Sequence, residues 1–285
     1  MNRIAPQIYI LGLQDRYRGL NLETFLRNQN ASFKPVWGID ARVEENAKVL
    51  ETFADQNLAK SYSGKKLLLG EIACAELHHR TYKEFFESGA EWSVIFEDDI
   101  GELLLPISVL SDLFSELGSE PTIVKFDVSP ERFRKFIRNA IIEKSGFSLQ
   151  EDFTLSYNTR AYGINRRAVR IIIETMKDSL FVNQSDWPIQ WRYKVRALSV
   201  SPRIALDNLN QSSVIEETAG PLGYLLESKR EITFMKRRRV FYVLSGYLVV
   251  KFLRSGLSPR PLYQQIYREF ARRLLGRRIL PHRDN

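Results

Sequence analysis

The sequence contains little cysteine and no long hydrophobic run. Cys74 is the only cysteine in 285 residues, which excludes an intramolecular disulfide and a CxxC metal or redox site. A reducing, cytoplasmic setting is therefore expected. The early apolar run IYILGL is too short for a signal-peptide core, and VFYVLSGYLVV at 240–250 falls short of the ~20 residues of a spanning helix. We expect a chain that does not cross a membrane.

Positive charge outnumbers negative charge only near the end of the chain. The net charge is +8, yet the segment from Lys229 to Asn285 holds 15 Lys and Arg against 3 acidic residues, a balance of +12. Residues 1–228 therefore carry −4. We predict a mildly acidic body at 1–228 and a separate basic helical tail at 229–285, with the boundary marked by AGPLGY.

Segments of strand type and helix type alternate through the first 200 residues. The predicted strands are IYILGL (8–13), FKPVW (33–37), WSVIF (92–96), TIVKFDV (122–128) and VRALSVS (195–201). The predicted helices follow Gly19, span 70–88, follow Pro106 and span 165–176. Such alternation predicts an α/β fold with a mostly parallel sheet, whose ligands bind at the carboxyl ends of strands. We interpret 129–152 as a loop or short helix and 206–213 as a loop.

Three consecutive carboxylates follow one predicted strand, in EWSVIFEDDI at 91–100. At an effective dielectric near 20, two carboxylates ~4 Å apart repel by about 4 kcal/mol, so Glu97, Asp98 and Asp99 need compensation. A hard cation such as Mg²⁺ or Mn²⁺, which prefers oxygen ligands, would supply it. A solvated acidic turn is the alternative.

The predicted helix GEIACAELHHRTYKEFF places a carboxylate and an imidazole on one mainly apolar face. The spacing puts Glu71, Ala75, His78, Tyr82 and Phe85 on a single stripe. Glu71 and His78 are candidate site residues on this basis. The structural alternative is a first-turn Glu favoured by the helix dipole and a core histidine with satisfied hydrogen bonds.

Together these motifs resemble the signature of glycosyltransferase family 25, a GE-G-C-LSH helix followed by a strand ending in EDD. The family includes bacterial lipopolysaccharide and lipooligosaccharide galactosyltransferases and procollagen galactosyltransferases. The resemblance covers roughly residues 4–216 and continues, in order, through IYILGLQDR, GIDA, NTRAYGINRRAVRIII, SDWPIQ and SPRIALDNLNQSSVI. This chain departs from the usual family residues at Gly12 (Asn), Ala41 (Gly), Ala73 (Gly) and Leu77 (Ser).

The resemblance implies a GT-A type nucleotide-sugar fold that uses a UDP-sugar and Mn²⁺ or Mg²⁺. A metal on the diphosphate would stabilise the negative charge that grows on the leaving UDP. We expect Asp99 to be the direct ligand and Glu97 to support the metal or a ribose hydroxyl. Asp98 is expected to point the other way or to orient the turn.

The resemblance also implies an inverting displacement, in which a general base takes the proton of the acceptor hydroxyl. Asp186 in SDWPIQW is the leading candidate, with Asp127 and Asp152 behind it. A helix N-cap is the structural alternative for Asp186, because Pro188 follows closely, and a turn carboxylate is the alternative for Asp127.

Residues near the end of the first strand complete the expected donor site. Leu11 and Gly12 could pack against a uracil ring, and Arg16 could meet the phosphates, although a surface charge is the alternative for Arg16. Asp40 in GIDA is a further candidate. The full set of expected donor-binding residues is Leu11, Gly12, Arg16, Asp40, Glu71, His78, Glu97 and Asp98.

The basic tail combines the cluster Lys236–Arg239 with the apolar VFYVLSGYLVVKFL and a later amphipathic pattern. This pattern is typical of helices that lie on an anionic membrane, where each Lys or Arg near the surface contributes about 1 kcal/mol. Packing on the body or a second subunit is an alternative. Nucleic-acid binding is a less favoured one, because no recognisable nucleic-acid module accompanies the arginines.

The sequence thus predicts an inverting, metal-dependent glycosyltransferase on the cytoplasmic face of the membrane. It would move a sugar, expected to be galactose, from a UDP-sugar to a lipopolysaccharide or lipid-linked oligosaccharide acceptor. The competing hypothesis is a non-catalytic metal- or anion-binding scaffold whose tail docks on a membrane or nucleic acid.

Overall fold

A computed structural model describes residues 5–63, 66–127, 142–144, 146–151, 159–176, 180–181 and 194–207. Asp152, Asp186 and the predicted tail at 229–285 lie outside the described residues, so the predictions made for them, and the division at 228, stay predictions. Within the described residues, no helix has both the length and the apolar character of a membrane span.

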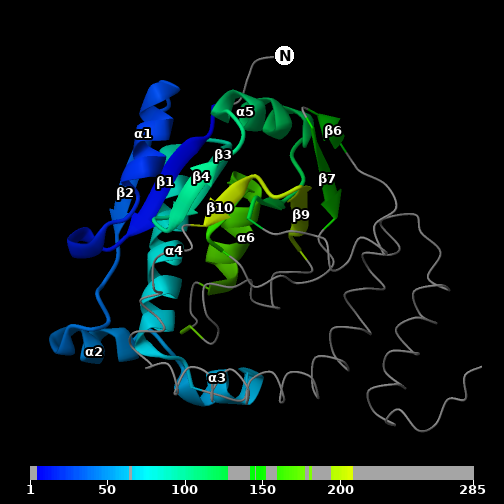
Figure 1. The fold of residues 1–285 in the computed structure, drawn as a ribbon. Helices are drawn as coiled ribbons and strands as arrows, with labels where there is room; N and C mark the ends of the chain where they lie inside the picture. Colours follow the sequence, from blue (N-terminus) through cyan, green and yellow to red (C-terminus); the bar gives the residue numbers. More distant parts are fainter. Residues whose placement is uncertain are drawn as a thin grey trace, which may run out of the picture. The chain divides into compact units, whose positions relative to one another are not determined.

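An eight-stranded sheet forms the centre of the described part (Figure 1). Its strand order is β2-β1-β3-β8-β5-β9-β7-β6, and only β7 and β8 run against the other six. The mostly parallel sheet predicted from the sequence is therefore confirmed. The strands are β1 (Gln7–Gly12), β2 (Phe33–Trp37), β3 (Trp92–Glu97), β5 (Thr122–Lys125), β6 (Ile142–Lys144), β7 (Phe147–Glu151), β8 (Ala161–Asn165) and β9 (Arg196–Ser201).

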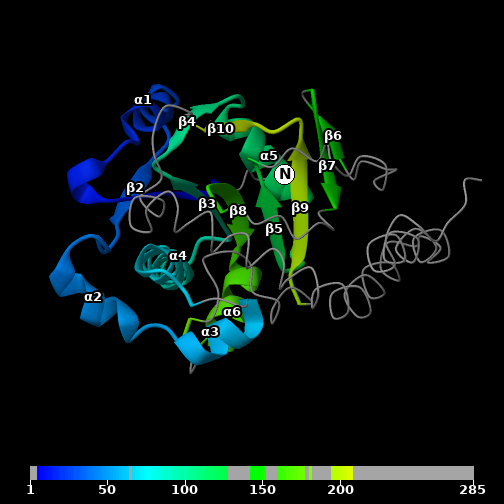
Figure 2. The same cartoon turned by 60° about the horizontal axis from the view of Figure 1, so that its bottom comes forward.

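Helices cover both faces of the sheet. Successive side chains of each strand point to opposite faces, so each strand contributes to both cores. Ile8 and Ile10 of β1 join the core beneath α1 (Leu20–Asn28) and α5 (Ile107–Glu116). Tyr9 and Leu11 join the core beneath α4 (Leu69–Ser88) and α6 (Arg166–Met176). Figure 2 shows α4 and α6 along one side of the strands. The arrangement is a three-layer α/β/α fold.

Smaller elements surround the N-terminal half of α4 and the edge of the sheet. The helices α2 (Glu44–Glu51) and α3 (Gln56–Ser63) enclose a separate apolar cluster with residues of α4, including Ile72 and Ala73. A short 3₁₀ helix, η1 (Gln14–Arg16), follows β1. β4 (Ile100–Leu103) pairs with β10 (Ala205–Asp207) in a two-stranded antiparallel sheet.

Most predicted elements are confirmed within one or two residues, but two predicted loops are wrong over the part of them that the structure describes. Part of 129–152 forms the hairpin β6–β7, which turns at Gly146 with a φ of 82° and pairs with β9. Phe147 and Leu149 are buried on alternate positions, a short strand pattern that surrounding charges obscured in the sequence. The start of 206–213 belongs to β10, because pairing with β4 fixes it in an extended conformation.

Candidate active site

The site forms where β1 and β3 end beside each other. The two strands are parallel neighbours with Leu11 opposite Glu97, and the amide of Asp98 donates to the carbonyl of Leu11 at 2.8 Å. Residues far apart in sequence therefore meet at one edge of the sheet. A pocket of about 130 Å³ lies there, lined by Leu11, Gly12, Leu13, Arg16, Arg18, Gly38, Ile39, Ala41, Gly70, Ala73, Cys74, Leu77, His78, Glu97, Asp98 and Asp99.

The pocket brings together most of the predicted donor and metal residues. Seven predicted residues line it, namely Leu11, Gly12, Arg16, His78, Glu97, Asp98 and Asp99. Asp40 and Glu71 are not among the lining residues, although their neighbours Ile39, Ala41 and Gly70 are. The wall opposite β3 comes from α4.

Asp98 is held by Arg18, which was not among the predicted site residues. The backbone amide, Nε and Nη2 of Arg18 donate to its carboxylate at 3.2, 3.1 and 2.6 Å. Burial raises the pKa of Asp98, and the hydrogen bonds and charge of Arg18 oppose that rise without cancelling it. Asp98 thus links the turn after β3 to the loop after β1. This is the contact expected if Asp98 orients the turn.

Gly12 leaves room for this carboxylate. A Cβ at position 12 would lie 2.7 Å from Oδ2 of Asp98 and 3.0 Å from its Cγ. Real Cβ atoms do not approach so closely, and Arg18 prevents the carboxylate from moving aside. The departure from the Asn usual in the family at this position therefore suits the Arg18–Asp98 pair.

Glu97 accepts hydrogen bonds from the opposite side of the pocket. Its Oε1 lies 3.3 Å from Nε2 of His78 and 3.1 Å from Oγ1 of Thr159. Burial by itself raises the pKa of Glu97, but the hydrogen bond and charge of His78, with Thr159 and Arg160, lower it overall. Glu97 is therefore a carboxylate held in its ionised form.

Asp99 is the least compensated carboxylate of the triplet, because the charges of Arg160 and Arg18 only partly oppose the rise in its pKa. Its Oδ1 is buried and has no hydrogen-bond partner. Burial, followed by the charge of Glu97, raises the pKa of Asp99 to about 7. A buried oxygen beside an ionised carboxylate is a donor set that suits a hard divalent cation, so Glu97 and Asp99 fit the predicted Mn²⁺ or Mg²⁺.

His78 sits in a chain of buried hydrogen bonds behind Glu97. Its Nδ1 lies 2.8 Å from the hydroxyl of Tyr162, which lies 2.8 Å from the hydroxyl of Tyr82. An ionised carboxylate can only accept, so Nε2–H of His78 donates to Glu97. Nδ1 of His78 and the hydroxyl groups of Tyr162 and Tyr82 continue the chain. The chain orients His78 toward the pocket.

The two other predicted donor residues are engaged close to the pocket. Glu71 is fully buried and accepts from the amide of Leu68 at 2.8 Å, as expected of the structural alternative of a first-turn Glu. Asp40 accepts from the amide, Nε and Nη2 of Arg42 at 2.9, 2.9 and 2.6 Å. These hydrogen bonds lower the pKa of Asp40, despite its partial burial.

Asp127, a predicted base candidate, lies just after β5 in a second charged cluster. Nε of Arg160 lies 3.4 Å from Oδ2 of Asp127, and Nη1 donates to Asp207 at 3.0 Å. The side chain of Asp127 is 1% exposed, and its Oδ1 is buried without a partner. Burial raises the pKa of Asp127 to about 6, although the charge of Arg160 opposes the rise.

Sequence patterns did not reveal the residues that organise these carboxylates. Arg18, Thr159, Arg160 and Tyr162 were not selected as site residues. A usable signal existed for two of them, since Arg18 follows the candidate Arg16 in QDRYRG, and Tyr162 belongs to the AY pair of the resemblance. No such signal pointed to the bridging role of Arg160, because its partners come from β10 and the end of β5.

Comparison with known proteins identifies the family. No match was found among curated proteins. Residues 5–185 match the model of "Glycosyltransferase family 25 (LPS biosynthesis protein)", which is more than half of the chain, and the match ends one residue before Asp186. The resemblance drawn from the motifs is confirmed, and the chain belongs to glycosyltransferase family 25.

Proposed function

We propose that this protein is an inverting, metal-dependent glycosyltransferase of the GT-A type. It moves a sugar, proposed to be galactose, from a UDP-sugar to a lipopolysaccharide or related surface-glycan acceptor. Family membership supports a glycosyltransferase of lipopolysaccharide biosynthesis. The single observation that carries the finer proposal is Asp99, whose buried carboxylate oxygen has no partner and lies beside ionised Glu97.

The donor is proposed to bind at the ends of β1 and β3. The pocket of about 130 Å³ accommodates only part of a nucleotide sugar, so the remainder extends beyond it. Leu11 and Gly12 offer an apolar edge for the uracil ring. Arg16, which lines the pocket, is the arginine proposed to meet the diphosphate.

Glu97 and Asp99 are the residues proposed to hold Mn²⁺ or Mg²⁺. The bound cation would offset the negative charge that develops on the UDP leaving group. His78 and Thr159 keep Glu97 ionised and fix its direction. Asp98, tied to Arg18, keeps the turn in place so that Asp99 faces the pocket.

A carboxylate is proposed to remove the proton of the acceptor hydroxyl while its oxygen bonds to the sugar and the bond to UDP breaks. Asp127 is nearly inaccessible and its carboxylate faces Arg160, which favours a structural role. Asp186 therefore stays the leading candidate and Asp152 the second. Replacing each by Asn should separate them, since loss of the base lowers kcat by about 10²–10⁴-fold.

The basic tail is proposed to hold the enzyme on the cytoplasmic face of the membrane, near a lipid-linked acceptor. The charge balance of +12 over 229–285 supports this role. Full-length protein should sediment with vesicles that contain anionic lipid, and replacement of residues 236–239 by Gln should weaken this binding. Equal sedimentation of both proteins would contradict the proposal.

Donor binding is tested by thermal unfolding with UDP, UDP-galactose or UDP-glucose, each with and without Mn²⁺. A ligand at 100 times its dissociation constant stabilises the folded state by about 2.7 kcal/mol. We expect a Mn²⁺-dependent shift in wild type that Asp99→Asn abolishes. Glu45→Gln, on the exposed surface of α2, makes the same change in charge and should keep the shift. A wild-type shift with Mn²⁺ that no nucleotide increases would favour the non-catalytic scaffold.

A further inference from the structure

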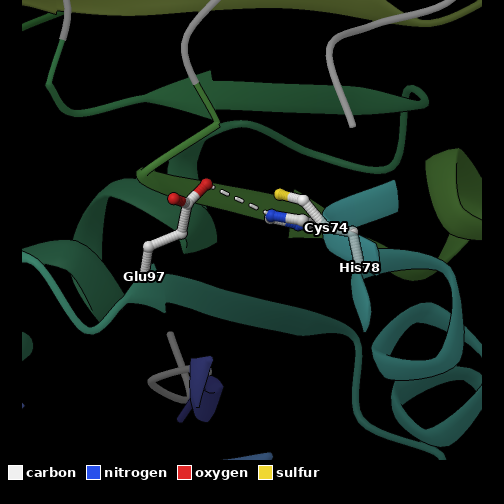
Figure 3. A group of neighbouring side chains, drawn as sticks. All are labelled: Cys74, His78 and Glu97. Carbon is white, nitrogen blue, oxygen red and sulfur yellow. Dashed lines mark hydrogen bonds and ion pairs between the residues drawn. The ribbon is translucent and has the colours of Figure 1, made fainter. Parts of the chain in front are cut away.

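Glu97 faces a second group of potential metal ligands, different from Asp99. Cys74 and His78 lie one turn apart on α4 and both line the pocket. Sγ of Cys74, a ring nitrogen of His78 and a carboxylate oxygen of Glu97 lie within 4.8 Å of one another. Figure 3 shows the sulfur and the imidazole directed toward the Glu97 carboxylate.

The separation of these atoms suits one small cation. A tetrahedral zinc site with Zn–N and Zn–O distances near 2.0–2.2 Å places the two ligand atoms about 3.4 Å apart. Nε2 of His78 and Oε1 of Glu97 are 3.3 Å apart. In such a site the sulfur of Cys74 would lie about 3.6 Å from each of these two atoms. The sulfur now lies within 4.8 Å of both, so a small rotation of the Cys74 side chain would be enough.

The surroundings of His78 are those of a metal-bound histidine. Ligating histidines usually use their second ring nitrogen for a hydrogen bond that fixes the ring. Nδ1 of His78 is 2.8 Å from the buried hydroxyl of Tyr162. When Nε2 binds a cation, Nδ1 carries the proton and donates to Tyr162, and the Tyr162 hydroxyl turns toward Tyr82 at 2.8 Å.

We propose that Cys74, His78 and Glu97 bind a thiophilic divalent cation such as Zn²⁺, with the fourth coordination position directed into the pocket. The thiolate and imidazole select borderline-soft metals, whereas Asp99 with Glu97 offers only oxygen and suits Mg²⁺ or Mn²⁺. Binding releases the thiol proton of Cys74 to solvent, because the thiolate is the ligand. This site stands on its own residues and does not depend on the transferase proposal.

One consequence does rest on the proposed function. Glu97 is shared by both groups, so occupation by Zn²⁺ removes a ligand from the hard cation. Zn²⁺ should therefore act as an inhibitor that competes with Mn²⁺.

The test is titration of full-length wild-type protein with Co²⁺, a spectroscopic substitute for Zn²⁺. Cys74 is the only cysteine in the chain, so any thiolate-to-cobalt charge-transfer band reports this residue. We expect a band that saturates at one Co²⁺ per chain and disappears when Zn²⁺ is added. Cys74→Ser should lack the band and bind Zn²⁺ about 100-fold or more weakly. A missing band in wild type, or an equal one in Cys74→Ser, would overturn the proposal.

His79→Gln is the matched control on the same helix. The ring of His79 packs edge-on against Phe181, 5.7 Å between centroids, and is not among the pocket-lining residues. The cobalt band should survive in His79→Gln and be lost in His78→Gln. Retention of the band in His78→Gln would contradict the assignment of the imidazole ligand.

A second measurement avoids the risk that a variant fails to fold. The reaction of Cys74 with a thiol reagent should slow at least tenfold when Zn²⁺ is present in wild type, and Mg²⁺ should have no such effect. Equal rates with and without Zn²⁺ would refute the site.

Asp99→Asn separates this proposal from the transferase proposal. The variant should keep the cobalt band and lose the Mn²⁺-dependent UDP shift. A band without any UDP shift in wild type would support the zinc site and count against the transferase. A UDP shift without a band would do the reverse.

Discussion

Two acidic clusters lie at the same edge of the sheet, and their carboxylates differ in how they pair with arginine. Arg160 bridges Asp127, after β5, and Asp207, at the end of β10. Arg18 makes three hydrogen bonds to Asp98, after β3. Asp99 lies next to Asp98, and its Oδ1 has no hydrogen-bond partner.

The difference indicates which carboxylates stabilise the fold and which are kept for a ligand. A buried carboxylate paired with arginine is costly to disturb, because a lone charge is left in a poorly solvated place. An uncompensated carboxylate instead costs stability until a cation binds to it. Asp98 belongs to the first class and Asp99 to the second, whereas Asp127 combines an ion pair with Arg160 and a buried Oδ1 without a hydrogen-bond partner.

The largest loss of stability is expected for Arg160→Met. The change leaves Asp127 buried without its cation and removes a bond to Asp207, so the free energy of unfolding should fall by about 3 kcal/mol. Arg203→Met is the control, because Arg203 is 40% exposed and pairs with Asp207 at 3.2 Å. Its cost should stay below about 1 kcal/mol in urea unfolding. Equal losses in the free energy of unfolding would show that Arg160 stabilises the fold no more than Arg203 does.

Asp98→Asn should cost about 2 kcal/mol, because three hydrogen bonds from Arg18 lose their charged acceptor. Glu174→Gln is the control. It disrupts an exposed i,i+4 pair with Arg170 at 3.8 Å, and the free energy of unfolding should change by less than about 0.5 kcal/mol. A loss in Asp98→Asn as small as in the control would mean that Arg18 does not hold the turn.

Gly12→Ala should cost about 1–2 kcal/mol, since the new methyl group meets Asp98 Oδ2 at 2.7 Å. The loss should shrink in an Asp98→Ala background, where the opposing carboxylate is gone. A double-mutant cycle of urea unfolding measures this coupling. Additive losses would show that position 12 and Asp98 do not compete for space.

The remaining effect has the opposite sign. The pKa of Asp99 is raised to about 7, so between about pH 4 and 7 the folded state binds a proton that the unfolded state has lost. Stability of the metal-free protein therefore falls as pH rises through this window. Asp99→Asn should remove that part of the slope and stabilise the metal-free protein at pH 8 by about 1–3 kcal/mol.

Parallel melts of wild type and Asp99→Asn between pH 5 and 8, with a chelator present, measure this effect. The difference in stability between the two proteins reports Asp99 alone, because the pKa of Asp127 is raised to about 6 in both. Mn²⁺ affinity of wild type should likewise weaken below pH 7, because the proton competes with the cation. A difference independent of pH would contradict the raised pKa.

Local pattern was enough to predict the elements that build the site. Strand-type segments before Gly12 and Glu97, and the helical stripe from Glu71 to Phe85, were confirmed in the fold. Parallel strands place their carboxyl ends together, so the meeting of Leu11 with the acidic triplet followed from the fold class. The family could be recognised from the same motifs.

Only the tertiary structure decided how the three carboxylates differ. Glu97, Asp98 and Asp99 are adjacent carboxylates in the sequence, but Arg18, His78 and Thr159 approach them from separate elements. A charge responds to burial and to partners within a few ångströms, and long-range folding sets both. The same holds for Cys74, whose sulfur gains an imidazole and a carboxylate as neighbours only when α4 packs against β3.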